Sequence, residues 1–397
     1  MTTKPEEANG ARKERKPRPQ GLEDWRQWPN YEAATLGLRN YWYPTVWARD
    51  LGDKPQGVKL LGENIMLIRE GSKVYALHDR CPHRGVKLSE GKKVFPGTVS
   101  CPYHGWTFDV TDGRLCAALP DGPDSPIVGN VSVRSYPTEE ALGLVWVFVG
   151  DQEPTPLRDQ LPEELFTHDF VAAGRITPGR YGNWRFAVEN GFDEGHARYL
   201  HRDQAFMMFR QMPGWARTKI VASEDGDWLF RVQESVEYES DFPGLGKWPR
   251  RKITQVAQRK MTPGEVGKRL DPTIKSLNLP GHISVRLPGL LRVAWTTYLH
   301  FEWYVPEDEN HHRYVQYAVR FKTGLGDVAF RLRYWTYIRW LFHGKFTGRD
   351  AWMVEEMDAP PERLFRPDVS ITRWRRLVES AFEPKREQKK PSAAKKP

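Results

Sequence analysis

Two short loops, each with one cysteine and one histidine, constrain the fold of this chain more than any other feature of its sequence. The first reads Cys81-Pro-His83, and the second reads Cys101-Pro-Tyr-His104 after seventeen intervening residues. Between residues 42 and 150, short alternating runs are broken by glycine, aspartate and proline, which is typical of an all-β unit. The two loops are therefore expected one hairpin apart in a β unit, where they can share one site.

The residue types in these loops predict an iron–sulfur cluster. Two thiolates can hold one iron of a 2Fe–2S cluster while two imidazoles hold the other, which is the Rieske arrangement. A structural zinc site uses the same residue types, but a zinc finger groups its cysteines together and its histidines together. Here each loop is mixed, which favours the cluster. The third cysteine, Cys116, lies outside the pattern and is expected to be a small buried residue.

A second motif, Asp193-x-x-His196-x-x-x-x-His201, predicts a mononuclear iron site. Two imidazoles and one carboxylate form the facial triad of non-haem Fe(II) oxygenases, which leaves coordination positions open for O₂ and water. A spacing of five rotates the two histidines by roughly 140° on a regular α-helix. We therefore expect a bulge, a 3₁₀ turn or a helix break between them. Asp193 suits the role of a carboxylate that accepts the other N–H of a metal-bound histidine.

The third iron ligand should be an acid far along the chain, and Asp350 is the best candidate. It stands at the start of a helix-like stretch over residues 350–357, from which it could face into the protein. The alternative is that Asp350 only caps this helix, a role that aspartate favours. The neighbouring acids Glu355, Glu356 and Asp358 are rival ligands.

The formal net charge of +9 says little about function, because residues 1–20 carry a net +3 and residues 384–397 a net +5. Both segments are expected to be disordered tails, and nucleic-acid binding is not expected. No apolar run approaches the ~20 residues that span a bilayer. The first residues lack the apolar core of a signal peptide. We therefore expect a cytoplasmic protein without a membrane segment.

The pattern divides the chain into two folded regions between the tails. Residues 21–150 comprise an N-terminal arm and the all-β region, and residues 151–164 are rich in proline and acids and resemble a linker. Residues 151–383 look α+β, with a helical stretch over residues 184–201 followed by strands over residues 228–239, 282–288, 290–305 and 312–322. Helices are expected over residues 330–342, 350–357 and 371–382. The aromatic stripe of residues 330–342 is interpreted as core packing.

From about residue 36 to 382 the chain resembles the α subunits of Rieske non-haem iron ring-hydroxylating oxygenases. Both motifs occur in the expected order, and the phrases LGLRNYWYP, VKLLGEN, NWRFAVENGFD and FEWYVP resemble the homotrimeric branch that includes carbazole dioxygenase, oxoquinoline monooxygenase and dicamba monooxygenase. The resemblance implies an all-β Rieske domain followed by a helix-grip (Bet v 1-like) catalytic domain with a central antiparallel sheet. The overall fold class is then α+β.

The same resemblance implies roles for individual residues. The cluster ligands are Cys81, His83, Cys101 and His104, and the iron ligands are His196, His201 and Asp350. Asp193 corresponds to the acid that links the iron site to the Rieske histidine of a neighbouring subunit in a head-to-tail homotrimer.

The implied activity is O₂-dependent hydroxylation of an aromatic or heteroaromatic compound, with electrons from NAD(P)H delivered by a separate ferredoxin and reductase. An O- or N-demethylating monooxygenase is an alternative, and a Rieske electron carrier or a zinc- and nucleic-acid-binding protein are less favoured ones. The carbazole enzyme has one residue fewer between its iron histidines, so its substrate does not simply transfer. Phe206, Met207 and Met208, just past His201, are candidate substrate-lining residues, although they could equally be ordinary core.

Overall fold

The computed structural model describes the greater part of the chain, in ten segments. These are residues 25–167, 169–201, 215–223, 226–237, 241–242, 246–247, 283–294, 298–321, 324–357 and 362–382. Both expected disordered tails, the rival ligand Asp358 and the lining candidates Phe206, Met207 and Met208 lie outside these residues. No described helix is long and apolar enough to cross a membrane.

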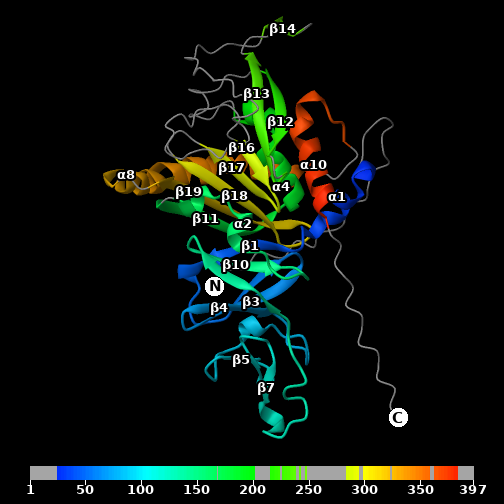
Figure 1. Cartoon of the computed structure of the whole chain (residues 1–397), viewed down its shortest axis with the longest axis vertical. Coiled ribbons are helices and arrows are strands. Elements are labelled where there is room, and N and C mark those ends of the chain that lie inside the picture. Colours follow the sequence, from blue (N-terminus) through cyan, green and yellow to red (C-terminus); the bar gives the residue numbers. More distant parts are fainter. Residues whose placement is uncertain are drawn as a thin grey trace, which may run out of the picture.

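The first unit consists of three small antiparallel sheets, as the alternating pattern predicts (Figure 1). Its sheets are β1 (Tyr41–Trp47), β10 (Leu144–Val149) and β9 (Thr138–Ala141); β2 (Gln56–Leu60), β3 (Glu63–Glu70), β4 (Lys73–His78) and β8 (Ser135–Tyr136); and β5 (Thr98–Ser100), β6 (Trp106–Asp109) and β7 (Leu115–Ala118). Cys116 lies in β7 and is exposed, so the expectation that it is buried is wrong. It falls at a position of this short strand that faces solvent, between the buried Leu115 and the half-buried Ala117.

The proline-rich segment after β10 is not a free linker. It forms two short helices, α2 (Leu157–Gln160) and α3 (Glu164–Thr167), and buries Leu157, Leu161 and Leu165 in the same core as β1 and β10. The Gln160 side chain accepts a hydrogen bond from the backbone of Trp42 and donates one back, each at 2.7 Å. The segment therefore packs against the first unit and connects it to the second.

The second unit is built on a seven-stranded antiparallel sheet in the order β11-β19-β18-β17-β16-β13-β12. The strands are β11 (Phe170–Tyr181), β12 (Trp215–Ala222), β13 (Trp228–Glu237), β16 (Ile283–Arg286), β17 (Leu290–Ala294), β18 (Leu299–Pro306) and β19 (His311–Phe321). The stretch predicted as one strand over residues 290–305 is in fact two, β17 and β18, which pair with each other. Two further short strands, β14 (Asp241–Phe242) and β15 (Gly246–Lys247), form a separate ribbon.

The two faces of the large sheet bury different partners. One face presents Phe301 and Trp303 to the first unit, where Trp146 packs edge-on against Trp303 at 5.5 Å between ring centroids. The opposite face carries the helices α4 (Trp184–Phe192), α9 (Thr347–Glu356) and α10 (Val369–Ala381), with Trp184 against Trp374. Because neighbouring residues of a strand face opposite ways, one strand serves both interfaces.

The N-terminal arm packs on the second unit although it precedes the first in sequence. It comprises η1 (Trp25–Gln27), α1 (Pro29–Ala33) and η2 (Ala34–Leu36), and α1 lies beside α10 in Figure 1. The backbone N–H of Tyr31 donates to Glu379 on α10 at 2.8 Å, and the Tyr31 hydroxyl donates to Glu189 on α4 at 2.5 Å. The arm therefore contacts both α10 and α4, and α4 leads into the second motif.

The C-terminal helical region is longer than predicted. From Leu325 to Glu356 the chain is continuously helical, with α8 (Leu325–Arg333), two π-helical segments, η6 (Tyr334–Ile338) and η7 (Leu341–Phe346), and α9. Phe330, Tyr334, Ile338 and Phe342 are buried, as the core interpretation of the stripe predicts. Trp335, Tyr337 and Trp340 are exposed, so only one side of the stripe is core.

Candidate metal centres

The two cysteine–histidine loops fold into matching turns. In the first, Cys81 N–H donates to the carbonyl of Val86 and Gly85 N–H donates to the carbonyl of Cys81. In the second, Cys101 and Gly105 make the same two bonds, with Trp106 as the partner of Cys101. Both glycines have a positive φ, 78° for Gly85 and 64° for Gly105, which a residue with a Cβ rarely adopts. The repeated C-P-x-x-G local sequence therefore sets the repeated turn.

The four predicted cluster ligands come together at this pair of turns. Cys81 and Cys101 are buried and close enough for their thiols to interact, while the rings of His83 and His104 lie 4.6 Å apart nearer the surface. Burial raises the pKa of the Cys81 thiol to about 11, although the backbone amides of His83 and Arg84 donate to its sulfur and oppose this shift. Those amides would stabilise a thiolate that binds a metal. The four residues therefore fit a cluster in which the two buried cysteines would hold one iron and the two more exposed histidines would hold the other.

The second motif begins at a helix break. The predicted single helix over residues 184–201 is two helices, α4 and α5 (Glu194–Leu200), and Asp193 ends one and caps the other. Its carboxylate accepts from Gly195 N–H at 2.8 Å and from His196 N–H at 2.9 Å. The same carboxylate lies 3.3 Å from His196 Nδ1. Asp193 thus both starts α5 and orients the first histidine.

The expected irregularity between the two histidines occurs at the second of them. Helix α5 is regular as far as Leu200, and His201 leaves it as the C-cap with φ −97° and ψ 8°. This departure from helical dihedrals changes the direction of the His201 side chain, so the two imidazole rings come within 5.6 Å of each other. A spacing of five residues is thereby compatible with one site.

Asp350 completes a three-residue group with these histidines. Its Oδ1 lies 2.9 Å from His201 Nε2 and 3.5 Å from His196 Nε2. One ligand atom from each of the three residues lies within 4.8 Å of the others. The rival acids Glu355 and Glu356 are exposed. Because α9 begins at Thr347, Asp350 sits inside the helix and is not its N-cap.

Neighbouring contacts hold this group in place. The Arg349 guanidinium donates to the carbonyl of Leu200 at 2.9 Å, which joins α9 to the end of α5. The Phe346 ring stacks on the His201 ring at 3.6 Å between centroids. His201 is fully buried, and its Nδ1 has no hydrogen-bond partner within the described part of the chain.

The electrostatics of the group favour a cation. Burial opposes ionisation of Asp350, but its hydrogen bonds to the two histidines outweigh burial and hold the pKa of its carboxyl well below the usual range. Burial also opposes protonation of His196, yet the Asp193 and Asp350 carboxylates raise its pKa to about 9. Burial lowers the pKa of His201. A half-buried carboxylate with two converging imidazoles is the donor set that non-haem iron binds, so these residues fit that metal.

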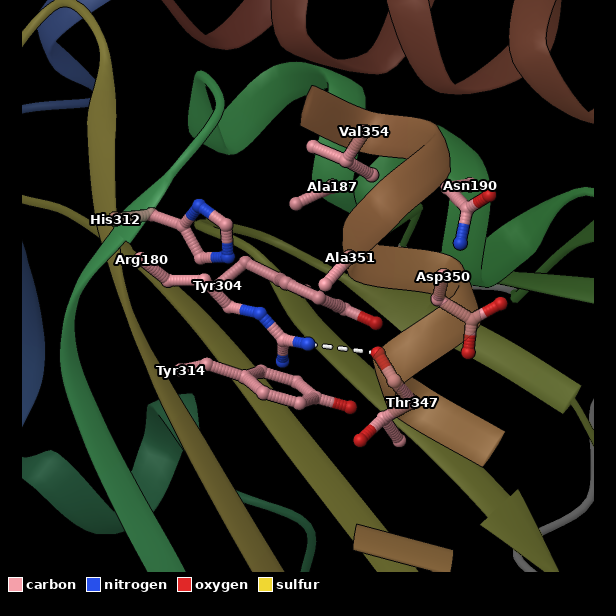
Figure 2. Close-up of a pocket in the computed structure, with 10 residues that line it drawn as sticks. All are labelled: Arg180, Ala187, Asn190, Tyr304, His312, Tyr314, Thr347, Asp350, Ala351 and Val354. Carbon is pink, nitrogen blue, oxygen red and sulfur yellow. Dashed lines mark hydrogen bonds between the residues drawn. The ribbon is translucent and has the colours of Figure 1, made fainter. Parts of the chain in front are cut away.

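A polar wall beside Asp350 is not signalled by either motif. Arg180, Tyr304 and Tyr314 extend from the sheet toward the helix that carries Asp350 (Figure 2). Arg180 donates to the carbonyl of Thr347 at 2.6 Å. The small cavity between them has room for a water molecule or two and not for an aromatic compound. The available sequence signal is polar residues at alternate positions of an otherwise apolar strand, from His300 to Tyr304.

Comparisons with known proteins agree with this geometry. Two family models match: "Rieske [2Fe-2S] domain" over residues 41–137 and "Homotrimeric ring hydroxylase" over residues 148–383. The terminal oxygenase component of carbazole 1,9a-dioxygenase from a Sphingomonas species is 35% identical over 388 residues, which cover 88% of this chain and 93% of the relative.

Two further matches are the oxygenase component of a demethylase and a solved structure of an oxygenase in complex with ferredoxin. The oxygenase component of dicamba O-demethylase from Stenotrophomonas maltophilia is 36% identical over 176 residues, covering 42% of this chain and 49% of the relative. Among solved structures, the oxygenase in the reduced complex with ferredoxin of carbazole 1,9a-dioxygenase superposes with a TM-score of 0.71 at 28% identity, covering 89% of this chain and 92% of that one.

Proposed function

Because this chain belongs to the homotrimeric ring hydroxylases and carries a Rieske domain, we propose that it is the terminal oxygenase that hydroxylates an aromatic or heteroaromatic compound with O₂. The observation that carries the proposal is the convergence of His196, His201 and Asp350 in a chain that also contains the paired cysteine–histidine loops. An electron carrier would need only the loops.

The proposed division of labour follows from the donor atoms. When bound, the 2Fe–2S cluster and the mononuclear iron supply electrons and the O₂-activating centre. Cys81, Cys101, His83 and His104 would hold the cluster, and His196, His201 and Asp350 would hold the iron from one side. The Asp193 carboxylate would accept a hydrogen bond from Nδ1–H of His196. The proton would then stay on Nδ1, and Nε2 would offer its lone pair to the metal. The residues set geometry and access, while the redox chemistry belongs to the metals.

We propose a homotrimer in which the two centres of different chains work together. The hairpins around β5 and β7 lie at one end of the chain, and the sheet of β1 and β10 separates them from α4, which leads to His196 (Figure 1). The side chains of Asp193 and His196 remain 17% and 18% exposed. A neighbour's cluster loop, with its outward histidines, could therefore reach Asp193.

The electron source would be a separate ferredoxin and reductase, since a similar oxygenase forms a complex with ferredoxin. We place the protein in the cytoplasm, because the ligand thiols and the exposed Cys116 suit a reducing compartment.

Demethylation is the second candidate reaction, supported by the likeness to the dicamba demethylase component. The same iron site could serve either reaction, so the substrate decides between them.

A single-turnover experiment tests the proposal. The purified holoprotein is reduced chemically and exposed to ¹⁸O₂ with fused heteroaromatics, simple arenes and aryl methyl ethers. Two labelled oxygens in one product indicate a dioxygenase, and one labelled oxygen or formaldehyde release indicates a monooxygenase or demethylase. His196→Ala is the matched control, and it should lose product while it keeps the cluster spectrum. Product formation by His196→Ala at the wild-type yield would refute the proposal.

A further inference from the structure

Strand β18 carries ionisable residues on the sheet face that the helices cover. His300, Glu302 and Tyr304 alternate along the strand and therefore share one face. In the paired strand β19, Gln316 lies opposite Glu302 and Tyr314 opposite Tyr304. This face contacts α4, which leads to the candidate iron site. Three consecutive polar positions on a buried face are unusual unless they have a specific task.

Two buried histidines, one on this face and one on the helix that faces it, each have one nitrogen that no described residue binds. His300 on β18 is 1% exposed and His343 in η7 is 4% exposed, and their ring centroids lie 5.4 Å apart. His300 Nε2 binds Glu302 at 2.8 Å, and His343 Nδ1 binds the Tyr334 hydroxyl at 3.0 Å. Within the described ranges, no protein group bonds to His300 Nδ1 or His343 Nε2. An unsatisfied buried polar atom costs about 1–3 kcal/mol, so each of these two nitrogens is expected to bind a partner that the described residues do not supply.

The neighbours determine what the two free nitrogens offer. Burial lowers the pKa of His343, and the nearby charges of His300, Arg175 and Arg339 lower it further, so this imidazole is neutral. As a neutral imidazole, His343 can accept a hydrogen bond from the Tyr334 hydroxyl at Nδ1 and carry its proton on Nε2, where it would be a donor. Glu302 is an ionised acceptor, so His300 donates through Nε2 and in its neutral form has a lone pair on Nδ1. One donor and one acceptor therefore lie side by side.

A chain of aromatic ring contacts connects this pair to the candidate iron site. The Phe346 ring stacks on His201, Phe342 lies 5.0 Å from Phe346, and His300 lies 6.0 Å from Phe342, between ring centroids. His343 precedes Asp350 by seven residues, about two turns, on one continuous helix.

We propose that His300 and His343 form a polar subsite for the substrate and bind an uncharged group that both accepts and donates a hydrogen bond, of which an aromatic hydroxyl is the simplest. The proposal rests on the proposed function, because it assigns the substrate class of that same site. His343 Nε2–H would donate to the hydroxyl oxygen, and the hydroxyl would donate to His300 Nδ1. A carboxylate is disfavoured, because Glu302 already places a buried negative charge beside His300.

The test compares binding of naphthalene, 2-naphthol and 2-naphthoate to the intact, metal-loaded holoprotein by calorimetry. Two added hydrogen bonds should make 2-naphthol bind about tenfold or more tighter than naphthalene. His343→Phe keeps the ring shape without the donor and should reduce this preference to about twofold. His343→Gln restores an N–H donor and should recover part of the preference.

Another buried histidine, His312, provides the matched control. His312 donates to the carbonyl of Gly182 at 2.8 Å and has no part in the pair, so His312→Gln should keep the full preference. Equal binding of naphthalene and 2-naphthol, tightest binding of 2-naphthoate, or no binding of 2-naphthol up to its solubility limit would each overturn the proposal. Binding requires no turnover, so an intact preference without any ¹⁸O product would refute only the oxygenase function.

Discussion

The two roles of Asp193 can be separated by substitution. Its carboxylate caps α5 through Gly195 N–H and His196 N–H and also faces the His196 ring. Asp193→Asn keeps one oxygen for the cap, so it should cost less than about 1 kcal/mol of stability, whereas Asp193→Ala should cost about 1–2 kcal/mol. Loss of the carboxylate behind a metal-bound histidine should lower product yield in Asp193→Asn about 10–100-fold.

The assay is ¹⁸O product per reaction centre in a single turnover, with urea unfolding and the visible spectrum of the cluster measured on the same samples. The expected pattern is a stable Asp193→Asn protein with an intact cluster and low yield. Wild-type yield in Asp193→Asn, with a loss only in Asp193→Ala that follows its lower stability, would refute the functional role. Asp193 would then be only a helix cap.

Three further outcomes test the iron ligand and the second unit. Asp350→Ala should lose one iron per chain and keep about two in the cluster, measured by metal analysis beside the visible spectrum; full iron content would exclude it as a ligand. Burial raises the pKa of Asp368 from 3.8 to about 6, so the folded state holds this proton more tightly and stability falls as pH rises between those values. Asp368→Asn should therefore stabilise the protein by about 1–2 kcal/mol at pH ~8 after allowance for solvent screening, and by almost nothing at pH ~4, in urea unfolding at both pH values; an equal gain at both would contradict this. Arg375→Met leaves the buried Glu189 without the partner that binds it at 2.6 Å, and should cost about 3–5 kcal/mol. Adding Glu189→Gln should recover most of that loss, and a loss below about 1 kcal/mol in the single variant would contradict the pairing.

The sequence predicts a structural feature correctly where the residues that form the feature are close to one another in the chain. The turns around Cys81 and Cys101 depend on glycines and prolines within the same five residues, so their repeated form is visible in the sequence. The β runs of the first unit are equally local. The helix cap at Asp193 is also local, but the regular apolar pattern over residues 184–201 hides the break it makes.

Expectations fail where contacts come from distant segments. Residues 151–164 look like a linker because prolines and acids dominate, yet Leu157 and Leu161 are buried in a core that includes β1, more than a hundred residues earlier. The helix that carries Asp350 begins earlier than predicted, at Thr347, because it continues without a break from the preceding helical segment, whose buried side packs on the sheet. Cys116 is exposed because it faces away from the core in which the neighbouring Leu115 is buried.

The sequence alone determined the chemistry available to this protein: a thiolate–imidazole set for a cluster and an imidazole pair for iron, each coded within a few residues. Only the tertiary structure decided that Asp350, 149 residues after His201, meets the two histidines, and that His300 faces His343. The physical reason is that a long-range contact depends on how sheet and helices pack, and no short stretch of sequence encodes that packing.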